Sequence, residues 1–263
     1  MKVVTKMKEV PHSLARLING NSWQQITIGH SDAMTFLLKG PRYNQYLKIQ
    51  PNNSIENLYH EKEKLEWLQG KLSVPEVLYY DKDETNEYLL ITELKGINAS
   101  DKSYEASLSF LIELLALGLK TIHSLSIESC PFNQKIDVKI EEARKRVENG
   151  LVDEEDFDDV RKGIKANELF DELISKKPIN EDLVFTHGDY CLPNIIIDEG
   201  KVSGFIDWGR AGVSDRYQDL ALATRSIAFN FGKEHIPFFL KEYGVKELDE
   251  SKIFYYQLMD EFF

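Results

Sequence analysis

This chain has few cysteines, fewer basic than acidic residues and no long apolar runs. Its 263 residues include only two cysteines, Cys130 and Cys191. Two thiols cannot build a disulfide framework, so we expect a cytoplasmic protein with reduced thiols. No spacing of Cys or His residues suits zinc. No signal peptide or bilayer-spanning apolar run is evident, so we expect no membrane partner. The net charge of -12 argues against a nucleic-acid partner, which would favour a basic face.

Repeats and low-complexity segments are also absent, whereas 42% of the residues are hydrophobic, enough for one or two packed units. Short alternating runs predict strands up to about residue 93. From residue 101 onward, apolar residues recur at helical spacing. The pattern predicts an α+β chain with a small β-rich lobe over 1–93, a linker over 94–100 and a larger, mainly helical lobe over 101–263. In the second lobe we expect helices near 108–122, 138–149, 167–174, 215–229, 236–243 and 250–260.

The most informative stretch is Thr186–Gly209, THGDYCLPNIIIDEGKVSGFIDWG. Its order of acid, amide and acid is typical of metal-assisted phosphoryl transfer, in which the protein orients a hydroxyl and neutralises phosphate charge. Asp189 is predicted to accept the proton of the hydroxyl, and Asn194 and Asp207 to supply oxygens to Mg²⁺. The alternative is that His-Gly-Asp is a surface turn and Asp207 a helix N-cap.

A phosphate-binding ion pair is predicted in the first quarter of the chain. Lys48 lies in the apolar, strand-like run Tyr46–Ile49, where a lysine without a partner would be costly. The segment Ser54–Gln69 has helical spacing and could present Glu61 to that lysine. Protein kinases use such a pair of strand lysine and helix glutamate. Taken alone the pairing is a weak signal, because an ordinary solvated lysine would look the same.

Several strings in the chain point to one family. They are HGDYCLPN at 187–194, GFIDWGRAGVSDRYQDLALATRSI at 204–227, WLQGKLSVPEVL, HSLSIESCPF and the terminal MDEFF. Over nearly its whole length the chain resembles the aminoglycoside phosphotransferases, most closely the aminoglycoside 3'-phosphotransferases. The resemblance implies a protein-kinase-like bilobal fold and ATP- and Mg²⁺-dependent transfer of the γ-phosphate to the 3'-hydroxyl of kanamycin- or neomycin-class antibiotics, giving resistance. We also expect a monomer or weak dimer.

On the nucleotide side, the resemblance adds several residues to the phosphate-binding pair of Lys48 and Glu61. It implies that Ser31 is a hydroxyl of the loop over the phosphates and that Tyr46 is the ring beneath adenine. The backbone of the linker strand would read the adenine edge at Thr92, Glu93 and Leu94.

On the antibiotic side, a polycation needs acidic side chains around it. By resemblance, one acidic loop covers the sugar rings, and the terminal residues form a clamp that two arginines help to order. These residues are Asp156, Asp158 and Asp159 in the loop, Asp260, Glu261 and the terminal carboxylate of Phe263 in the clamp, and Arg210 and Arg225. The alternative for the acidic loop is an ordinary solvated surface.

The chain departs from the family pattern where specificity is decided. Close relatives commonly have one or two acids about one turn after Arg225, whereas this chain has Phe229 and Asn230. A protein substrate is not expected, because the Gly-x-Gly-x-x-Gly loop and the His-Arg-Asp motif of protein kinases are missing. Two alternative functions are a kinase of another small hydroxylated metabolite, such as choline, homoserine or a sugar amine, and a pseudokinase that binds without turnover.

Overall fold

The structure is a computed structural model that describes residues 10–26, 33–55 and 57–263. The chain divides into two units, Met1–Lys95 with Ser203–Gly209, and Gly96–Val202 with Arg210–Phe263. The lobe boundaries expected from the sequence remain a prediction, and they did not include the return of Ser203–Gly209 to the first unit. Ser31 lies outside the described residues.

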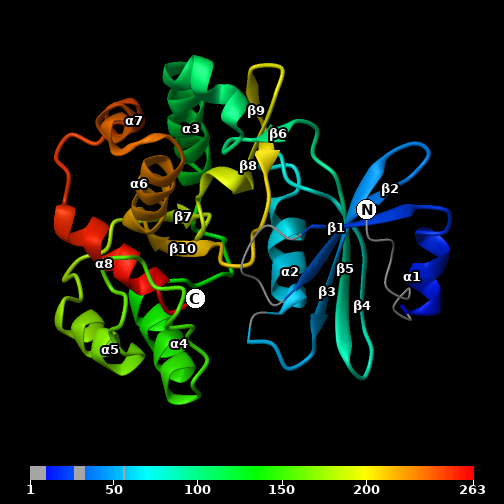
Figure 1. Cartoon of the computed structure of the whole chain (residues 1–263), viewed down its shortest axis with the longest axis horizontal. Coiled ribbons are helices and arrows are strands. Elements are labelled where there is room, and N and C mark those ends of the chain that lie inside the picture. Colours follow the sequence, from blue (N-terminus) through cyan, green and yellow to red (C-terminus); the bar gives the residue numbers. More distant parts are fainter. Residues whose placement is uncertain (1–9, 27–32, 56) are drawn as a thin grey trace. The chain divides into compact units, whose positions relative to one another are not determined.

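The first unit is built on an antiparallel sheet of five strands in the order β1-β2-β3-β5-β4 (Figure 1). A short helix, α1 (His12–Leu17), precedes the sheet, and α2 (Leu58–Leu68) packs against β4 and β5. The strands are β1 (Ser22–Ile26), β2 (Met34–Lys39), β3 (Asn44–Pro51), β4 (Val77–Lys82) and β5 (Asn86–Thr92). The sheet expected from alternating residues is therefore present.

Alternation along β3 decides where its lysine lies. Leu47 and Ile49 are fully buried in a core cluster with residues of α1, β2 and β5. Since successive side chains of a strand point to opposite faces, Lys48 projects from the other face, where Glu61 of α2 meets it. The helix begins later than predicted, because Asn57, and not Ser54, caps it by accepting a hydrogen bond from His60 N at 2.9 Å.

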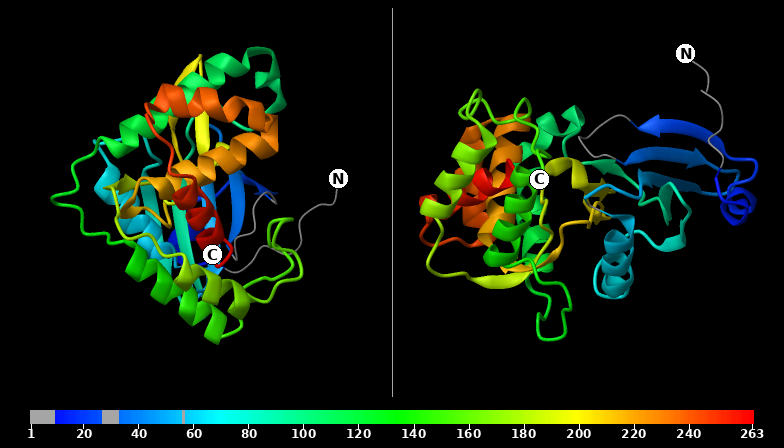
Figure 2. Two further views of the ribbon diagram at one scale, coloured as in Figure 1. Left: turned by 90° about the vertical axis from the view of Figure 1, so that its left-hand side faces the viewer. Right: turned by 90° about the horizontal axis from the view of Figure 1, so that it is seen from below.

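The second unit is mainly helical, as the spacing of its apolar residues predicted. Helix α3 packs on α7, α6 on α8, and α4 on α5 (Figures 1 and 2). The α-helices are α3 (Leu108–His123), α4 (Ile136–Glu148), α5 (Ala166–Ser175), α6 (Tyr217–Phe231), α7 (Ile236–Tyr243) and α8 (Glu250–Asp260). The 3₁₀ helices are η1 (Lys102–Ser107), η2 (Leu192–Asn194) and η3 (Lys233–His235).

Short strands carry the motif Thr186–Gly209. Strand β7 (Leu183–Thr186) pairs with β10 (Gly212–Asp215), and a second sheet has the order β6-β8-β9. These strands are β6 (Ile97–Asn98), β8 (Ile195–Asp198) and β9 (Lys201–Phe205). The hairpin of β8 and β9 confirms the loop-and-hairpin interpretation of the motif, and the last residues of β9 enter the first unit.

One described segment, Lys102–His123, is long and apolar enough to cross a membrane by length and composition, with a mean hydropathy of 1.4. No bilayer-spanning run was expected from the sequence, and the helix predicted near 108–122 is α3. Leu111, Ile112, Leu115 and Leu119 of this segment are almost completely buried. It is the core helix of the second unit, which passes the same test of length and composition.

Candidate active site

In the first unit, the structure brings Lys48, Glu61 and Asp207 together. The Lys48 ammonium donates to both carboxylate oxygens of Glu61, at 2.7 and 2.8 Å, and to Oδ1 of Asp207. Burial alone lowers the pKa of Lys48, but Asp207 and Glu61 outweigh it and raise the pKa above its ordinary value. Lys48 is therefore a fixed cation held between two acids.

The segment that carries Asp207 is tied to the first unit at several points. Phe205 N donates to Ser73 O at 3.1 Å, and Ser73 Oγ donates to Ser203 O. A Cβ on Gly204 would lie 2.5 Å from Ser73 O, so the close approach of the two chains requires glycine here. Trp208 is fully buried and donates its indole N–H to Phe205 O, as expected of a packing residue.

The predicted adenine-side residues lie at neighbouring ends of β3 and β5. Tyr46 pairs in register with Ile91, one residue before Thr92. Burial and then Glu93 raise the pKa of Tyr46. The Glu93 carboxylate accepts from Asn44 Nδ2 at 2.9 Å. The Thr92 amide donates to Glu76 O at 3.0 Å, and Thr92 Oγ1 accepts from Glu76 N at 2.9 Å.

In the second unit, Asp189 follows β7 in a loop that Asp219 of α6 holds. The fully buried Asp219 carboxylate accepts hydrogen bonds from His187 N at 2.7 Å, Gly188 N at 2.8 Å and His123 Nε2 at 3.0 Å. Gly188 has a φ of 84°, in the left-handed region that favours glycine. The loop is thus fixed by its backbone, which leaves the Asp189 side chain to interact with other groups.

Asn194 in η2 contacts Asp189 directly. Its side-chain N–H₂ donates to Asp189 Oδ2 at 2.8 Å and to Asp189 O at 3.1 Å. Because both bonds use the amide nitrogen, the amide oxygen of Asn194, the predicted magnesium ligand, lies on the other side of the amide group. The structure therefore joins the predicted base to one of the predicted magnesium ligands.

The oxygens of Asn194 and Asp207 suit Mg²⁺, which usually takes one or two protein carboxylates and fills its shell with water and phosphate. The Asp207 side chain is 45% exposed, although Lys48 binds one of its oxygens. Within residues 10–26, 33–55 and 57–263, no three His, Cys, Asp or Glu residues gather as a cage for a metal. Asn194 belongs to the second unit and Asp207 to the first, and the amide oxygen of one and the carboxylate of the other are each chemically suited to an ion that takes most of its ligands from water and phosphate.

The predicted antibiotic-binding residues form a network of arginines and acids in the second unit. Arg161 contacts Glu261 at 2.7 Å and Asp158 at 3.3 Å, and Asp158 N donates to Glu261. Arg225 contacts Asp158 and Asp260, and Arg210 contacts Asp260 at 3.1 Å. We call this set the terminal charge network; it comprises Asp158, Arg161, Arg210, Arg225, Asp260 and Glu261.

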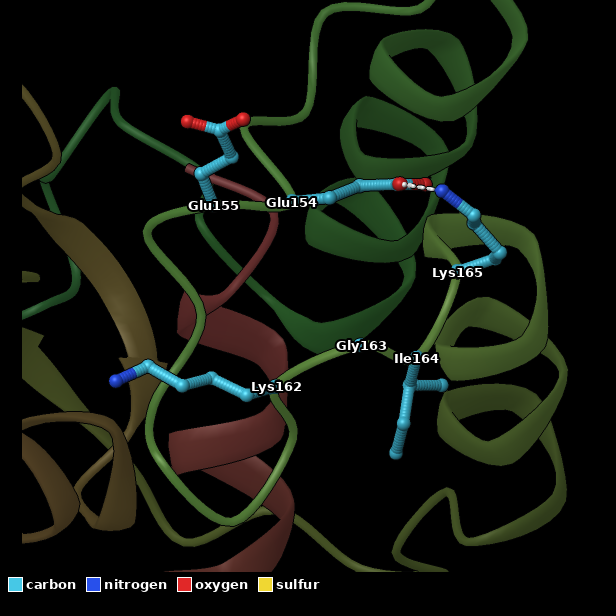
Figure 3. Close-up of a pocket in the computed structure, with 6 residues that line it drawn as sticks. All are labelled: Glu154, Glu155, Lys162, Gly163, Ile164 and Lys165. Atoms are coloured by element: carbon cyan, nitrogen blue, oxygen red, sulfur yellow. Dashed lines mark hydrogen bonds and ion pairs between the residues drawn. The ribbon is translucent and has the colours of Figure 1, made fainter.

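The other acids of the predicted loop behave differently. Glu154 accepts from Ala166 N at 2.9 Å, at the start of α5, and contacts Lys165 at 2.6 Å. Figure 3 shows the contact between Glu154 and Lys165, two of the residues that line an open hollow. Glu155 and Lys162, which also line the hollow, extend away from the Glu154–Lys165 contact. Asp159 pairs with Lys162 on the surface and its side chain is 88% exposed. Asp156 is also exposed. Of the three predicted loop acids, Asp158 joins the terminal charge network.

The rings of the final two residues are docked against the second unit. Phe262 is buried against Phe170, with ring centroids 6.0 Å apart. Three cationic groups lie near the Phe263 ring. Their distances to the ring centroid are 3.9 Å for Lys139 Nζ, 4.7 Å for Arg146 Cζ and 5.6 Å for Arg210 Cζ. These contacts hold the terminal residue in place.

Comparison with known proteins decides the family. The model of the phosphotransferase enzyme family, APH, matches residues 22–262. The chain belongs to this family. This phosphotransferase is 40% identical to an aminoglycoside 3'-phosphotransferase of Niallia circulans, over 96% of this chain and 97% of the relative. It is 36% identical to the enzyme of that name from Streptomyces fradiae, over 95% and 98%.

Solved structures confirm the kinase-like α+β fold of this phosphotransferase. The crystal structure of an aminoglycoside 3'-phosphotransferase of type VIII matches with a TM-score of 0.85 and 33% identity, covering 95% of this chain and 97% of that one. The aminoglycoside phosphotransferase APH(3'')-Id of Streptomyces rimosus, in complex with ADP and streptomycin, matches with a TM-score of 0.79 and 27% identity, covering 95% and 96%. The family identified from the motifs is therefore confirmed.

Sequence reasoning missed three side chains of this phosphotransferase that hold predicted site residues. Asp219 binds the loop before Asp189, Arg161 joins Asp158 to Glu261, and Lys64 donates to Gly209 O. Lys64 had a signal, since it follows Glu61 by three residues on the same face of α2. Arg161 had none, because Asp158 and Arg161 lie in the turns that precede α5.

Proposed function

We propose that this chain is an ATP- and Mg²⁺-dependent kinase that transfers the γ-phosphate to the 3'-hydroxyl of kanamycin- or neomycin-class aminoglycosides and so confers resistance. The observation that carries the proposal is the pairing of Lys48 with both Glu61 and Asp207, which sets a phosphate-binding cation beside a metal-binding acid. The 40% identity to an aminoglycoside 3'-phosphotransferase supports the choice of acceptor. ATP places the reaction in the cytoplasm.

In this mechanism Asp189 accepts the proton of the acceptor hydroxyl. The hydrogen bond from Asn194 fixes the carboxylate plane, and the bonds from the preceding amides to Asp219 fix the backbone. Positioned this way, Asp189 orients the hydroxyl as well as deprotonating it. Magnesium, held by Asn194 and Asp207, would neutralise charge on the phosphate oxygens.

The nucleotide would meet residues of the first unit. Lys48 grips the outer phosphates, and Glu61 keeps that ammonium oriented. Tyr46 supports the adenine ring, while the backbone of Thr92, Glu93 and Leu94 reads its edge. Ser31, outside the described residues, keeps its proposed role over the phosphates by resemblance alone.

The aminoglycoside would bind at the terminal charge network. Asp158 and Asp260 are the acids best placed to accept ammonium groups, because Arg225 already holds both in one cluster. Exposed Asp156 and Asp159 would contact outer amines, and the Phe263 carboxylate and Glu261 would complete the clamp. Arg210 and Arg225 order Asp158 and Asp260, so an amine that binds either of these acids competes with an arginine for it.

The residues after Arg225 bear on substrate range. Phe229 is 88% exposed, and the side chain of Asn230 donates back to Ser226 O at 2.9 Å. Lys102 donates to Asn230 O at 2.7 Å, which adds a cation where close relatives commonly have acids. We infer weaker binding of aminoglycosides whose extra ring extends beyond the phosphorylated one.

The test is ATP-dependent phosphorylation of kanamycin beside tobramycin, which lacks the 3'-hydroxyl, with Asp189→Asn as control. We expect turnover of kanamycin, little or none of tobramycin, and loss of at least about 10²-fold in the variant. Equal turnover of both antibiotics would contradict the assigned position. Turnover of neither, in a protein that binds ATP, would redirect the search to a panel of choline, homoserine and amino-sugar acceptors.

A further inference from the structure

Lys64 is a buried lysine for which the mechanism above has no use. It is only 5% exposed and lies on the inner face of α2, one turn after Glu61. A buried ammonium is costly unless strong acceptors surround it. Its ammonium donates to the main-chain carbonyl of Gly209, which lies 145 positions later in the chain. Lys64 therefore joins α2 to the segment that carries Asp207, a segment that Lys48 of β3 also contacts.

That segment has an unusual backbone. Asp207 has a φ of 62°, in the left-handed region that residues with side chains rarely adopt. Such a conformation persists only where the surroundings enforce it, and it is often found at functional sites. The Trp208 indole bonds to Phe205 O on one side of Asp207, and Lys64 binds Gly209 O on the other. The backbone around Asp207 is therefore fastened on both sides.

The two lysines of this region have different tasks. Lys48 binds the carboxylate of Asp207 and would have to share it with an incoming nucleotide and metal. Lys64 binds a main-chain carbonyl beyond the carboxylate, so its contact can persist when Lys48 changes partners. Both lysines also interact with Glu61, Lys48 as an ion pair and Lys64 through its charge.

We propose that Lys64 is a positioning residue that fixes the backbone of Asp207–Gly209 and so presents the Asp207 carboxylate to the magnesium–nucleotide. The inference rests on the proposed function. Its consequence is pre-organisation: without Lys64 the segment would sample other backbone conformations, and binding would have to restore the productive one. Nucleotide binding without magnesium would be affected far less.

The test compares Lys64→Met, which removes the donor, with Lys64→Arg, which retains one. Lys62→Met is the matched control, because Lys62 lies on the same helix and pairs with Glu66 at its surface. The first readout is amide hydrogen exchange at Phe205–Gly209 in the protein without ligands. The second is calorimetric affinity for ADP with magnesium and with EDTA. The third is kcat and the KM of kanamycin.

Loss of one hydrogen bond from a charged donor corresponds to about 10- to 100-fold in an equilibrium. In Lys64→Met we therefore expect exchange at Trp208 and Gly209 to accelerate about tenfold or more. The gain in ADP affinity on adding magnesium should shrink about tenfold, kcat should fall, and the KM of kanamycin should stay within about twofold. Lys64→Arg should restore most of each value.

Exchange and magnesium dependence in Lys64→Met equal to those of Lys62→Met would overturn the proposal. So would a Lys64→Arg variant as impaired as Lys64→Met, because the donor would then not be the feature that matters. The exchange readout needs no nucleotide or antibiotic. A wild-type protein that phosphorylates no acceptor would therefore count against the proposed function, while the exchange data would still decide whether Lys64 holds the segment.

Discussion

Replacing Asp219 by asparagine should displace the catalytic loop at little change in side-chain volume. Asp219 Oδ1 accepts from Gly188 N, and Oδ2 accepts from both His187 N and His123 Nε2. An asparagine can keep one of these oxygens but must turn an N–H₂ group toward the other donors. The least costly orientation retains the two bonds at Oδ2 and leaves Gly188 N facing a second donor.

The expected cost follows from these contacts. A hydrogen bond to a charged acceptor contributes about 1.5–3 kcal/mol, and a buried donor left without a partner costs about 1–3 kcal/mol more. We therefore expect Asp219→Asn to lower the free energy of unfolding by about 3–5 kcal/mol. For a chain of this size, 1 kcal/mol corresponds to about 2–4 °C, so Tm should fall by about 6–20 °C.

The assay measures Tm by calorimetry and, well below Tm, the steady-state constants. Because the loop carries Asp189, kcat should fall by about 10²-fold, whereas the KM of ATP should change little. Asp171→Asn on the exposed face of α5 is the control, with no expected effect. A Tm within about 2 °C of wild type together with a kcat within about threefold would refute the idea that Asp219 positions the loop.

Three further predictions concern the second unit. Burial, aided by Asp158, raises the pKa of Glu261 to about 7 from an ordinary 4.5, so its stabilising contribution is complete below about pH 4.5 and is lost as the pH rises through 7. Glu261→Gln has a neutral side chain at every pH. The Tm of the variant minus the Tm of wild type should therefore increase between pH 5 and 8.5, and a difference that stays constant with pH in thermal melts would contradict the raised pKa. Gly188→Ala should lower the free energy of unfolding by about 3 kcal/mol or more in denaturant titrations, because the new Cβ would lie 2.1 Å from Arg210 O, and an unchanged midpoint would argue against that contact. Deleting Phe263 should raise the KM of kanamycin about tenfold or more with little change in kcat in initial-rate measurements, whereas a drop in kcat alone would place the residue elsewhere in the mechanism.

Much of the fold and several contacts could be predicted from local pattern. Strand alternation placed Lys48 opposite the core residues of β3, and an apolar stripe placed Glu61 on the inner face of α2. Asp189 and Asn194 were assigned to one motif, and their side chains are in contact. In each case the relevant geometry is set within one strand, one helix turn or one short loop.

The rest depends on contacts between distant parts of the chain. Nothing local to Asp219 indicates that its carboxylate binds the amides of His187 and Gly188, because helix packing brings them together. The acidic loop was treated as one surface, yet Glu154 bonds at the start of α5 while Asp159 pairs with Lys162. Charge alone does not distinguish a capping acid from an acid that binds a ligand.

The chain passes between its two units three times, after Lys95, after Val202 and after Gly209. This routing has a practical consequence for dissecting the protein. A fragment that ends at Lys95 would lack the strand that Ser73 binds, and it would leave Lys48 and Lys64 without Asp207 and Gly209 as partners. An autonomous first unit would need Ser203–Gly209 joined to it by a designed linker, because a fragment cut at the apparent boundary keeps the Lys48–Glu61 pair but loses the contacts that Lys48 and Lys64 make with the missing segment.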